Sequence, residues 1–232
     1  MTEQIRRVLA GKKALIVGVA NDQSIAYGCA RAFREAITGP LDVAVPGQLE
    51  AVFGQIADRW GQLDMLVHSI AFVPMADLQG GLLDWSAEGF ATAMDISCHS
   101  FIRMARLAAP VMKDVGSMFA MSHYGANRLV PNYNVMGSEN AALEASCRYL
   151  AYELGPRRIR VHAISPGPLK TRAASGLKDF ELLLNEAARK APLGEFVDIT
   201  DVGYTCAYLA TPFAHRVTGG TVYVDGGVSI VA

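Results

Sequence analysis

Short apolar, β-branched runs alternate along this chain with longer segments of helical periodicity, and this alternation restricts the fold more than any other feature. The strand-like runs fall at residues 14–19, 41–45, 63–71, 117–122, 159–165 and 221–227. The helical segments fall at residues 25–36, 48–60, 88–112, 132–154 and 199–210. Strands that are buried on both faces read as continuous apolar runs, and strand–helix–strand units join parallel strands. The sequence therefore predicts one α/β domain over residues 1–232, a doubly wound parallel sheet flanked by helices.

Composition argues against several classes of function. The net charge of −1 offers no basic surface for nucleic acid or an anionic membrane. The longest apolar runs, such as ALIVGVA, are too short to cross a bilayer, and the start MTEQIRRVLAGKK has no signal-peptide core. The cysteines, Cys29, Cys98, Cys147 and Cys206, are scattered, with no CxxC and no His pair at metal spacing. We therefore expect a cytoplasmic protein with reduced, buried cysteines and without a metal, nucleic-acid or membrane partner.

The turn after the first predicted strand has features of a phosphate-binding loop. It reads GVANDQSIAYG, in which Gly18 ends the strand and Ser24 is a good N-cap for the next helix. The free N–H groups and positive dipole end of a helix N-terminus suit a diphosphate. The spacing is not GxGxxG, so the generic dinucleotide fingerprint fails. From the residues alone, dinucleotide binding and an ordinary strand-to-helix turn both stay open.

Six segments, in chain order, resemble one enzyme family. They are GVANDQSIAYG, LDVA, VHSIAF, YNVMG, AISPGPLKTRAASGLKDF and TGGTVYVDGG. Together they resemble the NADH-dependent enoyl-acyl-carrier-protein reductase of bacterial type II fatty acid synthesis, a divergent member of the short-chain dehydrogenase/reductase superfamily. The resemblance covers nearly the whole chain. It implies a Rossmann-like sheet, an acyl carrier protein as the substrate carrier, and a homotetramer, with helices 88–112 and 132–154 and the tail VSIVA as contact surfaces.

The resemblance also implies an NADH site at the carboxyl ends of the strands, where ligands of such sheets bind. Gly18, Ser24 and Ile25 would hold the diphosphate, and Asp42 and Val43 would flank the adenine. The other residues that the resemblance assigns to the cofactor are Ser69, Ile70, Ala71, Asn140, Pro168, Leu169 and Thr171. Read without the family, the segment SPGPLKT is also compatible with an ordinary turn.

The implied reaction is hydride transfer from the nicotinamide to the β-carbon of a trans-2-enoyl thioester. Negative charge then builds on the thioester oxygen, and Tyr133 stands where the family places a hydrogen-bond donor to that oxygen. Without the family, a lone tyrosine at a helix start reads as a structural aromatic. The implied acyl pocket comprises Val73, Met136, Leu177 and Phe180, for which core packing is the alternative. Lys178 and Arg172 would meet the acidic carrier protein or remain solvated.

The first departure from the family is Asn140, seven residues after Tyr133. Seven residues are nearly two helical turns, so both side chains share one face. The family has a lysine there, which binds the nicotinamide ribose and places a positive charge beside the tyrosine. Asparagine is shorter and uncharged, and loss of a preorganised charge typically costs roughly 3–4 kcal/mol, about 10² to 10³ in rate. Gly137, four residues after Tyr133, excludes the other lysine spacing of the superfamily.

The second departure is His123, in the segment MSHYGA, where the family has a second active-site tyrosine. A histidine can donate a hydrogen bond to the substrate carbonyl, and does so better when protonated. Tyr124 is expected to point elsewhere, because successive residues leaving a strand diverge. The alternative is a histidine of the core or the surface.

The third departure is a missing unit. After RAFREA only ITGP precedes LDVA, whereas the family has roughly 25–30 more residues here, close to one strand–helix–strand crossover. We therefore expect residues 41–45 to pair in parallel with strand 14–19, with residues 63–69 on its other side, in a sheet of about six strands. Because the missing unit carries the adenine-ribose side of the site, NADH is expected to bind weakly.

Two functions from different classes follow. One is an NADH-dependent enoyl-acyl-carrier-protein reductase, impaired by the loss of the lysine and of the missing unit. The other is a degenerate, non-catalytic homologue that acts as a binding or subunit-partner protein. NADH binding distinguishes them.

Overall fold

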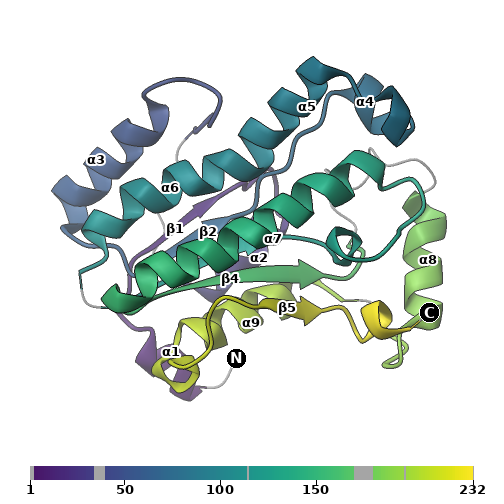
Figure 1. Ribbon diagram of the computed structural model, residues 1–232. Coiled ribbons are helices and arrows are strands. Elements are labelled where there is room, and N and C mark those ends of the chain that lie inside the picture. Colours follow the sequence, from purple (N-terminus) through teal and green to yellow (C-terminus); the bar gives the residue numbers. More distant parts are fainter. Residues whose placement is uncertain (1–2, 34–39, 114, 170–179, 196, 232) are drawn as a thin grey trace.

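A five-stranded parallel sheet forms the centre of the computed structural model, which describes residues 3–33, 40–113, 115–169, 180–195 and 197–231 (Figure 1). In spatial order the strands are β1 (Ala14–Val17), β2 (Met65–His68), β3 (Gly116–Met121), β4 (Ile159–Pro166) and β5 (Thr221–Val224). The register places Val17, His68, Ala120, Ala163 and Thr221 in one row across the sheet. The predicted α/β class with a parallel sheet is confirmed.

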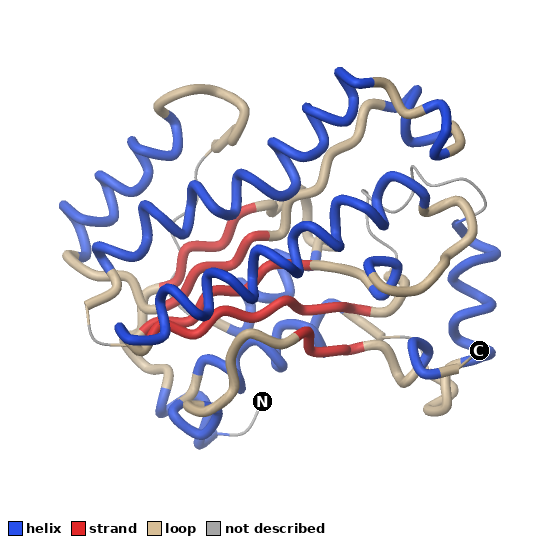
Figure 2. Tube along the Cα trace, viewed as in Figure 1, coloured by secondary structure: helices blue, strands red, loops and turns tan. Residues whose placement is uncertain are grey.

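Helices cover both faces of this sheet (Figure 2). One face packs against α3 (Gln48–Trp60), α6 (Ser100–Ala108) and α7 (Asn134–Leu154). The other packs against α2 (Ile25–Ala32) and α9 (Ile199–Ala210). Neighbouring strand residues serve opposite faces, so Met65 belongs to the second core and Leu66 to the first. The helices predicted at residues 48–60 and near 199–210 are confirmed with these ends, and those predicted at residues 25–36 and 132–154 are confirmed with shifted ends.

The remaining helices are short or lie outside the two layers. They are α1 (Glu3–Val8), α4 (Met75–Gln79), α5 (Ala87–Met94) and α8 (Phe180–Lys190). Single turns of 3₁₀ helix are η1 (Leu82–Asp84), η3 (Ala109–Val111), η4 (Tyr124–Ala126), η5 (Gly155–Arg157), η7 (Pro212–Ala214) and η8 (Val228–Ile230). Among the described residues, no helix is both long enough and apolar enough to cross a membrane.

The long helix predicted at residues 88–112 forms, but with a wide turn in its middle. The π-helix η2 (Asp95–His99) joins α5 directly to α6. Such single π-turns inside α-helices frequently lie at functional sites. Here the hydroxyl of Ser97, in the π-turn, accepts a hydrogen bond from the backbone N–H of Phe72 at 3.0 Å. The π-turn thus fixes the chain that leaves β2.

The prediction that residues 41–45 form a strand beside β1 is wrong. The segment is a turn: the Asp42 carboxylate accepts from the N–H of Ala44 at 2.9 Å, and the N–H of Val45 donates to the Asp42 carbonyl at 3.2 Å. Asp side chains favour such turns, and Pro46 next to Gly47 prevents a following ladder. Val43 is still buried, so the segment contributes to the core without joining the sheet. In the described part of the chain, β1 therefore pairs with β2 alone, and the sheet has five strands rather than about six.

Candidate functional site

The carboxyl ends of β1 and β2 meet at Gly18 and Ser69. The N–H of Ser69 donates to the carbonyl of Val17 at 3.0 Å. Gly18 has φ +104°, and a Cβ on it would clash with the backbone carbonyl of Ser69. Only glycine fits both the backbone angle and the contact. The structure thus brings the predicted phosphate turn next to the predicted cofactor segment Ser69–Ala71.

The start of α2 is capped by Ser24. The Ser24 side chain accepts from the N–H of Tyr27 at 3.3 Å, and its hydroxyl donates to the Asn21 carbonyl at 2.7 Å. The cap satisfies one N–H of the first turn, which Ile25 begins, and leaves other N–H groups of that turn without a partner in the helix. A helix N-terminus beside a tight glycine turn suits a diphosphate.

Tyr133 and Asn140 meet as the sequence predicts. Both side chains are buried, and the Asn140 Nδ2 donates to the Tyr133 hydroxyl at 3.0 Å and to the Met136 carbonyl at 2.8 Å. Burial raises the pKa of the Tyr133 phenol, the nearby Glu139 raises it further, and the Asn140 hydrogen bond opposes both. The phenol is therefore protonated at neutral pH. Because its oxygen already accepts from Asn140, its hydrogen is available for a substrate oxygen.

The His123 ring lies against Tyr133. Their ring centroids are 4.4 Å apart, and the Nδ1 of His123 accepts from the N–H of Gly125 at 3.1 Å. Burial lowers the pKa of His123 to about 4, against the opposing charge of Asp225. The neutral ring therefore carries its proton on Nε2, which makes that nitrogen a donor.

Tyr124 turns toward α8 rather than toward Tyr133. It packs against Ala187, Ala191 and Val228, although its ring remains 4.3 Å from the ring of His123. His123 and Tyr124 thus point in different directions, as predicted, but their rings remain in contact. The His123 ring is held between two tyrosines, which limits its movement.

A glycine contact fixes how α7 begins. A Cβ on Gly125 would lie 2.5 Å from Cδ1 of Tyr133, and one on Gly137 would lie 2.9 Å from the Gly125 carbonyl oxygen. The turn η4 can therefore press on α7 only because both positions are glycine. An open cleft of about 350 Å³ runs along this part of α7 and is lined by Leu82, Gly125, Ala126, Arg128, Leu129, Val130, Tyr133, Asn134, Gly137, Ser138 and Ala141.

Two of the predicted acyl-pocket residues come together. Val73, which is buried, and Met136, which is half-buried, belong to one small apolar cluster with Leu78 and Trp85 beside α7. Leu177 lies outside the described residues, and the side chain of Phe180 is not described, although the residue begins α8. The acyl role of all four stays a prediction.

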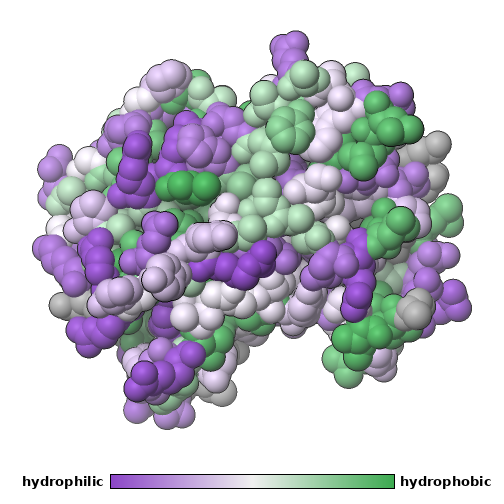
Figure 3. Space-filling model, viewed as in Figure 1, coloured by the Kyte–Doolittle hydropathy of each residue, from purple (hydrophilic) through white to green (hydrophobic). Residues whose placement is uncertain are grey.

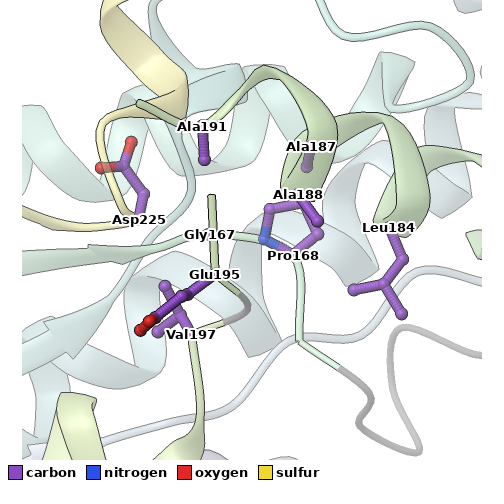
Figure 4. Close-up of a pocket in the computed structure, with 9 residues that line it drawn as sticks. All are labelled: Gly167, Pro168, Leu184, Ala187, Ala188, Ala191, Glu195, Val197 and Asp225. Carbon is purple, nitrogen blue, oxygen red and sulfur yellow. The ribbon is translucent and has the colours of Figure 1, made fainter. Parts of the chain in front are cut away.

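The other predicted cofactor residues fall at different places. Pro168 lies at the end of β4 in a small pocket under α8, with Gly167 and Asp225 beside it (Figure 4). Leu169 is buried in the core on the α2 and α9 face, and Thr171 lies outside the described residues. The Asp42 carboxylate is occupied by its own turn. None of these contacts tests the cofactor role, which stays a prediction.

Sequence reasoning missed Glu139 and Ser97. Glu139 stands one residue before Asn140 and is buried. Ser97 lies in the π-turn that packs on α7. The available signal is a carboxyl group on the same predicted helix as Tyr133 and directly beside Asn140. Within the described ranges no group of three His, Cys, Asp or Glu side chains is arranged to hold a metal ion.

Comparison with known proteins places these residues in a family context. A family model described as enoyl-(acyl carrier protein) reductase matches residues 34–229. The enoyl-[acyl-carrier-protein] reductase [NADH] 1 of Rhizobium meliloti is 41% identical over 255 aligned positions, covering 98% of this chain and 94% of the relative. The alignment has more positions than this chain has residues, so the relative carries residues that this chain lacks.

Solved structures agree with the sequence matches. The Bacillus cereus enoyl-acyl carrier protein reductase, solved with NADP+ and indole naphthyridinone, has a TM-score of 0.93 at 36% identity, covering 97% of this chain and 99% of that one. The reductase of Anaplasma phagocytophilum, solved in complex with NAD, has a TM-score of 0.91 at 38% identity, covering 97% and 96%. These relatives are named as reductases, so the comparisons give no support to the non-catalytic alternative.

Proposed function

Because this chain belongs to the enoyl-(acyl carrier protein) reductase family, we propose that it reduces the carbon–carbon double bond of trans-2-enoyl thioesters with NADH. The observation that carries the proposal is the pair Tyr133–Asn140, whose hydrogen bond leaves the phenol hydrogen free in a buried site. The names of the relatives supply the substrate class and the cofactor. The geometry supplies the groups that act.

The phenol of Tyr133 meets the charge that develops during the reaction. NADH, when bound, supplies a hydride to the β-carbon of the substrate. The electrons of the double bond move to the thioester oxygen, and the Tyr133 O–H donates a hydrogen bond to that oxygen. A proton taken up at the α-carbon completes the reduction. A donor placed in advance where charge develops is worth roughly 10² to 10³ in rate.

His123 provides a second donor in the same place. Its Nδ1 is occupied by the Gly125 N–H, so its Nε2–H is free for the substrate carbonyl. Because the ring is neutral above about pH 4, it donates without adding a positive charge. Among the groups that the structure describes around Tyr133, hydrogen-bond donors therefore stabilise the developing enolate, and a positive charge does not.

The residues present fit a dinucleotide. A Cβ on Gly18 would clash with the backbone carbonyl of Ser69, so the turn after β1 has no side chain there. Ser24 and Ile25, at the start of α2, would hold the diphosphate. Both amide hydrogens of Asn140 are used on Tyr133 and Met136, so Asn140 offers only Oδ1, an acceptor, to the ribose hydroxyls. The ribose would therefore donate to this chain. We infer weaker cofactor binding than a lysine would give.

An acyl carrier protein is the proposed substrate carrier, following the family description. Self-association is also proposed, because large side chains such as Tyr149 and Tyr152 on α7 and Ile230 near the C-terminal end are exposed. Figure 3 shows apolar side chains gathered at the right-hand edge, where α8 and the C-terminal end lie in Figure 1. The homotetramer and the cytoplasmic location stay predictions.

The test is reduction of a crotonyl thioester, followed by NADH consumption and by identification of the saturated product. The expected result is one product formed for each NADH consumed, with a strong loss in Tyr133→Phe. NADH binding without any turnover on thioesters of several chain lengths would refute the proposal.

A further inference from the structure

Glu139 is a buried carboxyl with no ion-pair partner among the residues that the structure describes. It lies on α7 with only 1% of its surface exposed, and its Oε2 has no hydrogen-bond partner. The ion pairs among the described residues join Lys12 to Asp64, and His99 and Arg103 to Asp95, and do not include it. An ionised carboxylate in such a place is costly, whereas a neutral acid is tolerated. The structure therefore favours the protonated form of this side chain.

The surroundings of Glu139 connect it to the candidate site. The Ser97 side chain, in the π-turn that packs on α7, is close enough to lower the pKa of this carboxyl in part. The same hydroxyl accepts from the N–H of Phe72 at 3.0 Å and donates to its carbonyl oxygen at 3.3 Å. Phe72 follows directly on the predicted cofactor segment Ser69–Ala71. Glu139 therefore lies near the π-turn that holds the backbone leaving β2.

The titratable groups near Glu139 are few. Tyr133 on its own helix and Cys98 in the π-turn both have a pKa raised in part by the Glu139 charge. The charged groups on other elements packed near α7 are already paired: Arg103 of α6 with Asp95, and Asp77 of α4 with the N–H of Ser86 at 2.7 Å. Glu139 is therefore the group whose ionisation changes the charge next to Tyr133.

We propose that Glu139 is a positioning residue of the reductase, neutral in the active form, and that its ionisation beside Tyr133 turns the site off. The inference rests on the proposed function. A negative charge there opposes the negative charge that develops on the substrate oxygen, and it strengthens the hold of the phenol on its own proton.

The pH range of the effect follows from the burial of the carboxyl. Burial raises the pKa of Glu139 to about 8, partly offset by Ser97. Activity is therefore expected to fall above about pH 8, approaching tenfold for each further pH unit if the ionised form is inactive. The neutral amide of Glu139→Gln keeps the shape and cannot ionise, so this variant is expected to lose the alkaline fall.

The first arm of the test compares kcat on a crotonyl thioester from pH 6 to 10 for wild type, Glu139→Gln and Glu144→Gln. Glu144 is the matched control, a buried glutamate on the same helix that accepts from the Ser122 hydroxyl at 2.7 Å. At pH 9 the ratio of Glu139→Gln to wild type should be about tenfold higher than at pH 7, with no such change for the control. Identical profiles for wild type and Glu139→Gln would overturn the inference.

The second arm needs no activity and compares the melting temperatures of wild type and Glu139→Gln from pH 5 to 9. The native pKa lies above the ordinary value of 4.5, so the wild-type carboxyl stabilises the fold fully below pH 4.5 and loses that contribution up to about pH 8. The advantage of Glu139→Gln should therefore grow between pH 5 and 8 and then level off. A constant difference would overturn the inference. If the wild type is inactive and the difference in melting temperature still grows between pH 5 and 8, the proposed function is refuted, whereas the conclusion that Glu139 is a buried neutral acid stands.

Discussion

Replacing Asn140 by lysine should raise the reductase activity. The Nδ2 of Asn140 lies 3.0 Å from the Tyr133 hydroxyl and 2.8 Å from the Met136 carbonyl, so an ammonium that enters this space finds an acceptor and lies beside the phenol. A positive charge there favours the developing enolate. The ammonium can also donate hydrogen bonds to the ribose hydroxyls, whereas Asn140 can only accept hydrogen bonds from them. The effect should therefore appear in both turnover and NADH affinity.

The magnitude is set by two opposing effects. Two unit charges 4 Å apart interact by about 4 kcal/mol at an effective dielectric constant of 20. Burial opposes this gain, because Asn140 is only 6% exposed and an ammonium there loses hydration. We expect a net gain of about 1.5–3 kcal/mol, or roughly tenfold to a hundredfold in kcat/KM.

The assay measures crotonyl-thioester reduction and NADH affinity for wild type, Asn140→Lys and Asn140→Gln. The glutamine variant lengthens the side chain without adding charge, so it should give little of the gain. Melting temperatures of all variants separate a catalytic effect from a folding effect.

One result would refute this reasoning. If Asn140→Lys melts like wild type and still consumes NADH no faster, the missing lysine does not limit the site. The unit that we expect to be missing after residue 36 would then be the proposed cause of any low activity.

Three further outcomes follow from the same contacts. Gly18→Ala should abolish NADH binding and lower the free energy of unfolding by about 2–3 kcal/mol, as measured by urea unfolding. The control is Gly47→Ala, which is also at positive φ but has no atom near the added Cβ, and it should cost about 1 kcal/mol. Tyr133→Phe should lower kcat roughly 10² to 10³-fold while unfolding within about 1–3 kcal/mol of wild type; an unchanged kcat would exclude the phenol as the donor. Burial lowers the pKa of His68 and His162 to about 4, below the ordinary value of 6.5. Each neutral histidine therefore contributes stability that is complete above pH 6.5 and is lost as the pH falls toward 4. The free energy of unfolding should fall by up to about 1.4 kcal/mol per pH unit for each histidine. Urea unfolding at pH 5 and 7 tests this, and equal stability at both would contradict it.

The sheet could be predicted from the sequence because its strands are continuous apolar runs. Residues 14–17, 65–68 and 159–166 are buried throughout, as a parallel sheet with two covered faces requires. The failure at residues 41–45 has the same origin. LDVAV is apolar enough for a strand, and Val43 is indeed buried, but the Asp42 side chain competes for the backbone N–H of Ala44. Hydrophobic pattern predicted the burial, and local hydrogen bonding decided the conformation.

The candidate site was predicted in part. The helical spacing of Tyr133 and Asn140 was enough to predict that they meet. The spacing could not show that both hydrogens of the Asn140 amide are already used, because one of them is donated to a backbone carbonyl, that of Met136. Nor could it show that His123 gives its Nδ1 to Gly125. Both facts depend on hydrogen-bond partners that only the folded backbone supplies.

The most direct test of the proposed function is a stoichiometric reduction with purified chain, NADH and a crotonyl thioester on acyl carrier protein. We predict that saturated butyryl thioester forms in step with NADH consumption, and that Tyr133→Phe, folded as judged by its melting curve, loses this activity. No NADH consumption by the wild type, or equal consumption by Tyr133→Phe, would contradict the assignment of reductase chemistry to this site.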